Sequence, residues 1–486
     1  MKAASATFFR PLPLPLALRV AVVLLPVFGA LAAQDDDGTG DRPGGETTVE
    51  ANGRNAFSMP AANLGDAERA RFAIGNSFFR RNWVEAPASA SARDGLGPHF
   101  IARSCGGCHS NDGRGAPPDF RRGLARQPVA LLIRLSIPGE GPHGEPVPEP
   151  VYGDQFTNSA VTGVRPEGRV TLRWQPVRGR FADGVAYTLL RPLYGFSQLA
   201  YGPMEKNTRI SPRIAPQLIG VGLIEAIADG DIEANAAAQG RRNDGIRGKM
   251  NRVWDAPSQQ TRPGRFGWKA NVATLAHQTA SAFVGDMGIT SRLFPNEACT
   301  AAQADCLNAP RGGKLGAGGR SPEIDDETLG HVVFYQAVLA PPVRRDASAP
   351  QVLQGQKLFQ QAQCAVCHRP RYTTAQAPFA RLSSTALNGQ TIYPFTDLLL
   401  HDMGEALADG RPDYLASGRQ WKTPPLWGIG LLPGVNDHQR LLHDGRARGV
   451  LEAVLWHGGE AQASRDQVLK MSRNERAALV RFVESL

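Results

Sequence analysis

Two short stretches constrain this chain more than any other feature, and both have the pattern C-x-x-C-H: Cys105-Gly-Gly-Cys108-His109 and Cys364-Ala-Val-Cys367-His368. The pattern is the attachment signature of c-type haem, because two thiols three positions apart can add to the two vinyl groups of one porphyrin. The adjoining histidine is then held beneath the iron as its proximal ligand. One copy would also suit a zinc knuckle or a redox pair. Two complete copies, which use four of the six cysteines, predict two covalently bound haem c groups, with zinc or dithiol chemistry as the alternative.

The N-terminus has the features of a signal peptide over residues 1–32. Three basic residues precede an apolar run of 14 residues, Val20 to Ala33, and Ala30 and Ala32 offer a small-residue cleavage site. The run is shorter than the roughly 20 residues that span a bilayer, so a retained anchor is the less favoured alternative, and no later segment is long and apolar enough to span. We therefore expect a periplasmic protein without a stable membrane span. In that oxidising compartment Cys299 and Cys306 are expected to form a structural disulfide.

The net charge of +9 does not indicate a nucleic-acid partner. Removal of the three basic residues of the signal leaves +6, and four haem propionates would bring the charge to about +2. No basic run with interleaved aromatic residues is present, so nucleic acid is not expected as a partner.

A repeated helix precedes each C-x-x-C-H stretch. After a Gly- and Thr-rich segment, residues 33–58, which predicts a flexible linker, a helical pattern runs over residues 63–83. Within it Phe72–Phe79 aligns with Val352–Phe359, glycine on glycine and phenylalanine on phenylalanine. A glycine inside a helix costs about 1 kcal/mol against alanine, so Gly75 and Gly355 are expected where another helix approaches closely.

Each half also supplies a helix suited to that approach. Ser472-Arg-Asn-Glu475 is a capping box before an amphipathic pattern, and Asp325–Leu339 is a second such pattern, stopped by two prolines. We therefore predict a mainly α fold of two c-type cytochrome-like domains, residues 59–343 and residues 350–486. Two ordinary amphipathic helices at the domain ends are the alternative.

The first domain carries a large loop-rich insertion, about residues 110–265. Its stretches Arg169–Trp174 and Val185–Leu190 alternate and are rich in β-branched and aromatic residues, which predicts a small β hairpin. Asn243–Gly248 faintly resembles a calcium loop, but arginines stand where acids should be. Calcium is therefore possible but weakly supported.

Three further blocks resemble the di-haem cytochrome c peroxidase and MauG superfamily over most of residues 60–486. They are Trp268–Gly288, the stretch His401-Asp-Met403-Gly404, and Thr423–Trp427 leading to His443-Asp-Gly445. Together with Trp456–Ala461 and Phe266–Ala270, these motifs are most similar to those of the di-haem oxidoreductase branch. That branch has also been labelled a thiol oxidoreductase. The thiol label fits poorly, because thiols spent as thioethers cannot exchange disulfides.

The resemblance implies roles for several residues. In the peroxidases a Trp between the haems is followed ten residues later by a Gln and then by an acid that lines the peroxide pocket, which here would be Trp268, Gln278 and Asp286. A buried core aromatic is the alternative for Trp268. This chain is two residues shorter between the last two, and has Asp where those enzymes have Glu. Splitting peroxide needs a group that moves a proton between the two oxygens. Asp286 is the first candidate and Glu225, a carboxylate in an apolar run, the second, with a helix cap or an ion pair as the alternative for either.

Several residues are candidates for the sixth ligand of the second haem. The superfamily places a Met or a Tyr shortly before the Pro-x-Leu block, where this chain has Gly418–Lys422. Met403 is our candidate metal ligand beside His109 and His368. His401, His443 and Met287 are the alternatives, and a core methionine is the ordinary reading of such a residue.

The resemblance implies an exported di-haem c-type peroxidase that reduces hydrogen peroxide with electrons from a small redox protein, such as a cytochrome c or a cupredoxin. One alternative is a MauG-like oxidase that uses high-valent haem on a protein or small substrate. The other is an electron-transfer protein without a substrate.

Overall fold

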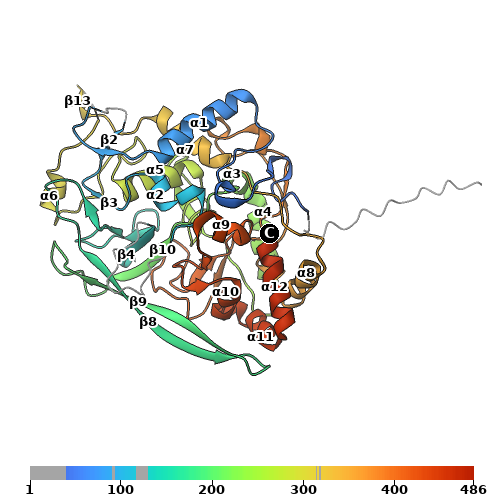
Figure 1. Cartoon of the computed structure of the whole chain (residues 1–486). Helices are drawn as coiled ribbons and strands as arrows, with labels where there is room; N and C mark the ends of the chain where they lie inside the picture. The colour runs from blue at the N-terminus through green and yellow to red at the C-terminus, as the bar shows by residue number, and fades with distance from the viewer. Residues whose placement is uncertain (1–39, 90–92, 117–129, 314, 317–318) are drawn as a thin grey trace, which may run out of the picture. The chain divides into compact units, whose positions relative to one another are not determined.

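The computed structural model describes residues 40–89, 93–116, 130–313, 315–316 and 319–486 (Figure 1). The predicted signal peptide lies outside the described residues. Residues 40–58, the described part of the predicted linker, pack into the structure, since Thr47 and Phe57 are buried. In the described part of the chain, no helix has the length and apolar character needed to cross a membrane.

The helices fall into short and medium lengths. The α-helices among the described residues are α1 (Asp66–Arg80), α2 (Cys105–Cys108), α3 (Val221–Glu225), α4 (Asp229–Gly240), α5 (Leu275–Met287), α6 (Ala304–Leu307), α7 (Asp326–Ala337), α8 (Pro350–Gln361), α9 (Leu432–Asn436), α10 (Val450–Trp456), α11 (Gln462–Lys470) and α12 (Arg473–Ser485). The predicted capping box of α12 is confirmed: Ser472 Oγ accepts from the amide of Glu475 and the Glu475 carboxylate accepts from the amide of Ser472.

Strands are more numerous than we expected, so the fold is mixed and not mainly α. They are β1 (Val84–Glu85), β2 (Asp94–Leu96), β3 (His99–Phe100), β4 (Leu131–Glu140), β5 (Pro146–Val147), β6 (Gln155–Phe156), β7 (Ser159–Ala160), β8 (Arg169–Arg180), β9 (Ala186–Ser197), β10 (Arg209–Ile214), β11 (Arg252–Asp255), β12 (Gln260–Pro263), β13 (Leu315–Gly316), β14 (Gly319–Arg320), β15 (Tyr372–Thr373), β16 (Thr391–Ile392), β17 (Leu400–Asp402), β18 (Gln420–Lys422), β19 (Arg440–Leu441) and β20 (Ala447–Arg448). Most form two-stranded sheets, and the largest sheet has the order β10-β4-β5 with β6 also paired to β4.

The two glycines of the repeat lie where helices cross, as predicted. A Cβ added to Gly75 would lie 2.2 Å from the His331 carbonyl oxygen of α7, and one added to Gly355 would lie 2.0 Å from the Ala478 carbonyl oxygen of α12. No carbon can approach an oxygen that closely, so only glycine permits these crossings. An aromatic pair follows each crossing: Phe79 lies 5.1 Å from Tyr335, and Phe359 lies 5.1 Å from Phe482, between ring centroids.

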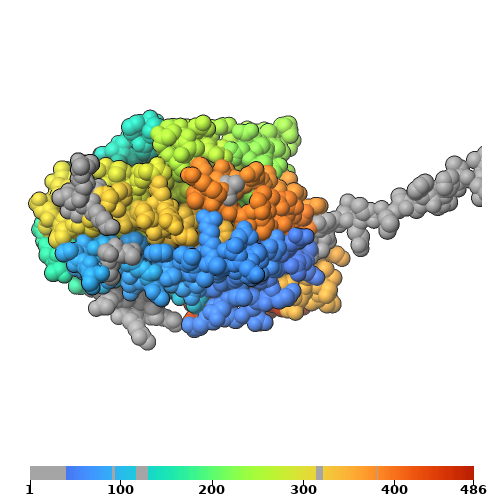
Figure 2. Space-filling view, turned by 90° about the horizontal axis from the view of Figure 1, so that it is seen from above, coloured from blue at the N-terminus to red at the C-terminus, as the bar shows by residue number. Residues whose placement is uncertain are grey.

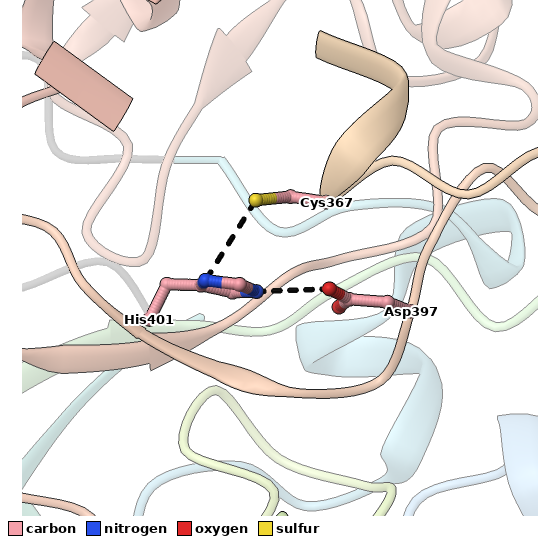
Figure 3. A group of neighbouring side chains, drawn as sticks. All are labelled: Cys367, Asp397 and His401. Atoms are coloured by element: carbon pink, nitrogen blue, oxygen red, sulfur yellow. Dashed lines mark hydrogen bonds and ion pairs between the residues drawn. The ribbon is translucent and has the colours of Figure 1, made fainter. Parts of the chain in front are cut away.

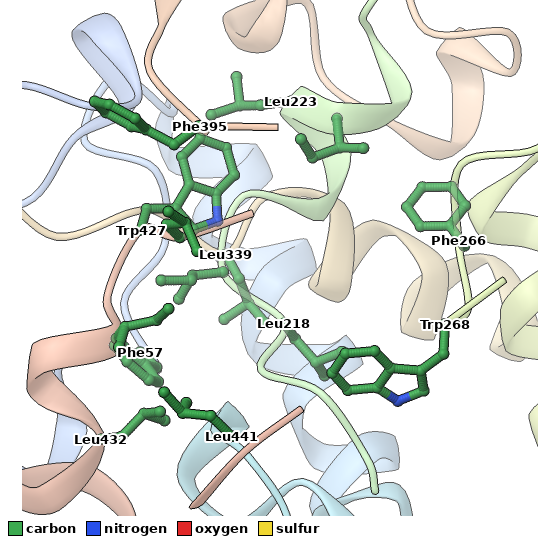
Figure 4. Packing of buried hydrophobic residues seen from close by; sticks show 14 of the residues in the cluster. Phe57, Leu218, Leu223, Phe266, Trp268, Leu339, Phe395, Trp427, Leu432 and Leu441 are labelled. Carbon is green, nitrogen blue, oxygen red and sulfur yellow. The ribbon is translucent and has the colours of Figure 1, made fainter. Parts of the chain in front are cut away.

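The two halves of the chain share one hydrophobic core. Phe57 and Trp268 belong to the same cluster of buried residues as Phe395 and Trp427 (Figure 4). On the surface, the segment around residues 381–386 lies beside α1 (Figure 2), where Ser384 Oγ donates to the Glu68 carboxylate at 2.6 Å. The division into two haem domains therefore stays a prediction, because the two halves pack around one shared core.

The insertion contains the predicted hairpin, which is longer than expected. β8 and β9 pair antiparallel over twelve residues each, from Arg169 opposite Ser197 to Arg180 opposite Ala186. Cys299 and Cys306 form a disulfide, as predicted. In the faint calcium loop, the Asp244 carboxylate is paired with Arg242 and accepts from the amide of Ile246, so its oxygens are already engaged.

Candidate functional site

The first C-x-x-C-H stretch presents a histidine ready to bind a metal. α2 carries Cys105 and Cys108, and His109 follows it, 6.3 Å from the Phe79 ring between centroids. His109 Nδ1 lies 2.8 Å from the Pro216 carbonyl oxygen and donates to it. This bond fixes the tautomer and leaves Nε2 free, which is how proteins orient histidine ligands. Burial lowers the pKa of His109, so the ring stays neutral and can ligate.

The second stretch repeats this arrangement. Cys364–Val366 form a 3-10 turn, and His368 Nδ1 donates to the Phe395 carbonyl oxygen at 3.0 Å. The His368 ring lies 6.2 Å from Phe359, the counterpart of Phe79. Burial lowers the pKa of His368 to about 4. Two histidines, each with one nitrogen tied to a backbone carbonyl and the other available, fit two irons.

The four motif cysteines fit thioether attachment better than thiolate chemistry. All four are free of disulfides. Burial raises the pKa of Cys105 and of Cys364 to about 12 and also raises that of Cys108 and Cys367. A thiol with a raised pKa is a weak nucleophile and a poor zinc ligand. The zinc and dithiol alternatives are therefore disfavoured.

A large cavity opens beside the second stretch. It holds about 1980 Å³ of space between atoms, including its open mouth, and Cys364, Cys367 and His368 line it. Most of the wall is apolar, but Arg114 and Lys422 also line it. Burial alone lowers the pKa of Lys422 to about 8, which means that no carboxylate balances this ammonium. An apolar slot with two buried cations in its wall fits a porphyrin that carries two propionates.

His401 belongs with Cys367 and Asp397 to a group whose ligand atoms lie within 4.8 Å of one another, but both of its ring nitrogens are already engaged by carboxylates. Its Nε2 lies 2.9 Å from the Asp397 carboxylate and its Nδ1 lies 2.7 Å from the Glu460 carboxylate (Figure 3 shows the Asp397 contact). Although burial disfavours the charged ring, the two carboxylates raise the pKa of His401 well above its usual value. The ring is therefore an imidazolium with both nitrogens engaged, 3.7 Å from the Cys367 sulfur.

Three other side chains of the cavity wall offer a ligand atom: Met403, His443 and His457. His443 stacks on Trp421 at 3.7 Å between ring centroids, and its buried Nε2 makes no hydrogen bond and lies 3.8 Å from the Asp444 carboxylate. His457 Nδ1 donates to the Ala453 carbonyl oxygen at 2.6 Å, the pattern seen at His109 and His368. His457 was missed at the sequence level, although its block was noted. Met287, also considered, belongs to α5 and is not among the residues that line this cavity.

Trp268 lines the cavity beside the second stretch and bonds to the segment that also holds His109. Its indole lines the cavity, and its Nε1 donates to the Ile214 carbonyl oxygen at 2.8 Å. Two residues on, Pro216 accepts the hydrogen bond of His109, and Ala215 packs beside Cys108. One tripeptide thus contacts both neighbourhoods. The Arg114 guanidinium lies 5.0 Å from the centre of the Trp268 ring.

Asp286 lies beside the first stretch. Its backbone oxygen accepts from the amides of Ile101 and Ala102, and its negative charge raises the pKa of Cys105 and Cys108. Gln155 Nε2 donates to its Oδ1 at 2.8 Å. Burial raises the pKa of Asp286, whereas Arg134 and the bond from Gln155 lower it, and the net shift is upward.

Glu225 contacts the other end of α5, the helix that carries Asp286. Its Oε1 accepts from the amide of Leu275, the first residue of α5, at 2.7 Å. Eleven residues of helix separate Leu275 from Asp286, or about 16 Å at 1.5 Å per residue. Glu225 therefore matches the helix-cap alternative. Gln278 lies near the start of α5, half-buried, where its amide bonds to Thr274.

Gln155 and Arg134 were missed at the sequence level. Gln155 is 5% exposed, its Nε2 bonds only Gly285 and Asp286, and its Oε1 is buried without a partner. Arg134, opposite it on β4, forms an ion pair with Asp154 at 2.7 Å. Isolated polar residues in the insertion gave no signal, because their relation to Asp286 arises only from the fold.

Comparison with known proteins gives one match. A family model described as "Di-haem oxidoreductase, putative peroxidase" matches residues 39–486. No curated protein and no solved structure matches the chain.

Proposed function

Because the chain belongs to the di-haem oxidoreductase family, we propose that it is an exported peroxidase that reduces hydrogen peroxide with electrons from a small redox protein, a cytochrome c or a cupredoxin. The observation that carries the proposal is an asymmetry. Both stretches supply the same histidine arrangement, but a half-buried carboxylate, Asp286, lies beside the first, whereas Met403 and His457 line the second.

The residues at the first stretch support proton transfer. Cys105, Cys108 and His109 would hold one haem, which when bound supplies the iron at which peroxide is split. Gln155 occupies Oδ1 of Asp286, so Oδ2 is the oxygen free to take a proton from one peroxide oxygen and return it to the other. Arg134 keeps positive charge near Asp286 and favours its ionised form.

The residues at the second stretch support electron storage. Cys364, Cys367 and His368 would hold the other haem, with Met403 as sixth ligand. Asp397 and Glu460 hold His401 as an imidazolium beside Cys367. A thioether ligand from Met403 would favour the reduced state of this haem, because methionine ligation raises the reduction potential of c-type haem. Trp268, which lines the cavity and bonds to the segment that also holds His109, is proposed to pass electrons inward.

The proposal is tested by haem content and spin state. We expect a pyridine haemochrome assay to give two haems per chain. The ferric or half-reduced protein should show one high-spin and one low-spin signal in electron paramagnetic resonance, because only the first iron is expected to keep an open position. Two low-spin signals under both conditions would favour the electron carrier without a substrate.

Met403→Leu should convert the second haem from low spin to high spin. Leucine fills a similar volume but offers no sulfur. The optical and paramagnetic spectra of the ferric variant check this, with Met287→Leu as the matched control, because that methionine is buried away from the cavity wall. If the low-spin signal survives in Met403→Leu and disappears in His457→Ala, the ligand is His457.

Gln155→Leu should move the acid limb of the pH–rate profile of peroxide cleavage to higher pH. Loss of the bond to the Asp286 carboxylate raises the pKa of Asp286 further, so protonation removes the reactive form at a higher pH. Below the limb we expect a rate about tenfold lower, the worth of one hydrogen bond to a charged group. Gln336→Leu is the control, because Gln336 is equally buried and bonds Thr279 of the same helix α5. A limb that stays in place in Gln155→Leu would contradict the role of Gln155.

A further inference from the structure

The β8–β9 hairpin forms a ribbon that no other described strand extends. The two strands pair only with each other, over twelve residues each. In Figure 1 the ribbon runs along the lower edge of the molecule, past α10 and α11. Phe196 packs on the protein near the base of the ribbon, and Val177 and Leu189, which point to the opposite face of the ribbon, pack on it nearer the tip. The side chains of β8 that do not pack are exposed to solvent, and neither candidate haem site uses them.

The exposed side chains of the ribbon are strongly basic. Residues 169–197 contain five arginines and one acid, a formal net charge of +4. Four of the arginines are exposed on β8: Arg169, Arg173, Arg178 and Arg180. The single acid, Asp183, is held by Arg476 at 2.8 Å, so within the ribbon no carboxylate balances the exposed guanidinium groups. Such a field attracts an anionic partner and raises its association rate.

The ribbon packs on helices that line the cavity beside the second stretch. At its tip, the amide of Ala182 donates to the Leu469 carbonyl oxygen of α11 at 2.9 Å, and Arg476 lies 3.9 Å above the Phe181 ring. Further back, Arg448 donates to the Thr188 carbonyl oxygen at 2.6 Å. The adjoining α10 and α11 contribute lining residues of that cavity, including Ala453 and Ser464. A partner on the ribbon would therefore sit beside the second haem.

We infer that the exposed arginines of β8 form the docking surface for an acidic redox protein that reduces the second haem. The inference rests on the proposed function, because it names the surface and the charge of the electron donor. The step moves one electron from the reduced carrier to the ferric second haem, and no bond forms or breaks. Val185 and Leu193 are exposed beside the arginines, at 49% and 43%, and give the apolar contact that a charged rim alone lacks.

Stopped-flow reduction of the ferric protein tests this without peroxide. The probes are two reduced donors, an acidic cupredoxin and a basic c-type cytochrome, each mixed anaerobically at several ionic strengths. We expect the acidic donor to reduce the second haem faster, with a rate that falls as salt rises. In the variant Arg173→Glu/Arg178→Glu that rate should fall at least about tenfold at low salt.

Arg81→Glu/Lys206→Glu is the matched control, because it reverses the same charge at two exposed positions outside the ribbon. An equal loss in the control, or faster reduction by the basic cytochrome, would overturn the inference. Circular dichroism of each variant shows whether the ribbon variant is folded. If the ribbon variant is not folded, Arg173→Gln/Arg178→Gln takes its place, since it keeps polar side chains. It changes the charge by about half as much, and the rate of reduction should again fall at low salt.

Binding is measured separately with zinc-substituted cupredoxin, which cannot exchange electrons. Its nuclear magnetic resonance signals should broaden with the wild-type chain and not with the ribbon variant. A duplex oligonucleotide is mixed with the wild-type chain in a parallel experiment. If its signals broaden and those of the cupredoxin do not, the inference is overturned. If the acidic donor reduces the haem through the ribbon but peroxide is not consumed, the docking surface stands and the proposed peroxidase function fails.

Discussion

Asp286→Asn is expected to slow peroxide cleavage by a factor of about 10² to 10⁴, the usual worth of a positioned general acid-base group. Asparagine keeps an oxygen to accept the hydrogen bond from Gln155, so the local packing is preserved. It cannot take and return a proton. Haem content should not change, because the Asp286 side chain makes no hydrogen bond to Cys105, Cys108 or His109, and its backbone bonds to Ile101 and Ala102 remain in the variant.

Pre-steady-state mixing of the pre-reduced protein with peroxide measures this step, because it follows the haem and not electron delivery. Glu225→Gln is the companion variant. Glu225 accepts from the amide of Leu275, so its loss should lower stability and leave the haem step intact. An unchanged rate in Asp286→Asn together with a large loss in Glu225→Gln would assign the proton transfer to Glu225.

His109→Ala is expected to abolish peroxide turnover while the low-spin spectrum of the other haem survives. The reason is again the asymmetry: Asp286 lies beside the first stretch, whereas Met403 lines the cavity of the second. His368→Ala should do the reverse and remove the low-spin signal, so that turnover fails only because the electron supply is lost.

Spectra and turnover of the two variants separate the outcomes. With an excess of a chemical reductant, His368→Ala should still cleave peroxide, and His109→Ala should not. If His368→Ala instead loses the high-spin signal, the reactive haem is the second one, and the assignment of the two sites is inverted.

Local patterns predicted those parts of the molecule that depend on neighbours in sequence. The glycines of the repeat indicated helix crossings, because a helix interior rarely tolerates glycine without a packing reason, and both crossings are present. The hairpin was expected over six residues a strand and extends over twelve. Pro176 and Gly179 hid its length, because both residues are depleted in strands.

Tertiary contacts decided the rest. Asp286 and Glu225 looked alike in sequence, as carboxylates within apolar runs. Only the fold shows that one caps α5 and the other lies beside Cys105 at the far end. Gln155 is 131 positions from Asp286, and the many two-residue strands have no alternation long enough to detect, which is why a mainly α fold was expected.

The tripeptide Ile214–Pro216 has a consequence for the energetics of the pair of sites. Its carbonyl groups accept from His109 and Trp268, at 2.8 Å each, and its first amide donates to the His443 carbonyl oxygen at 2.6 Å. If reduction at one iron shifts this tripeptide, the reduction free energy at the other iron changes as well. Linkage requires this change to be equal in both directions. The two reduction steps should therefore be cooperative, and the half-reduced protein is a distinct thermodynamic species whose population depends on that coupling free energy.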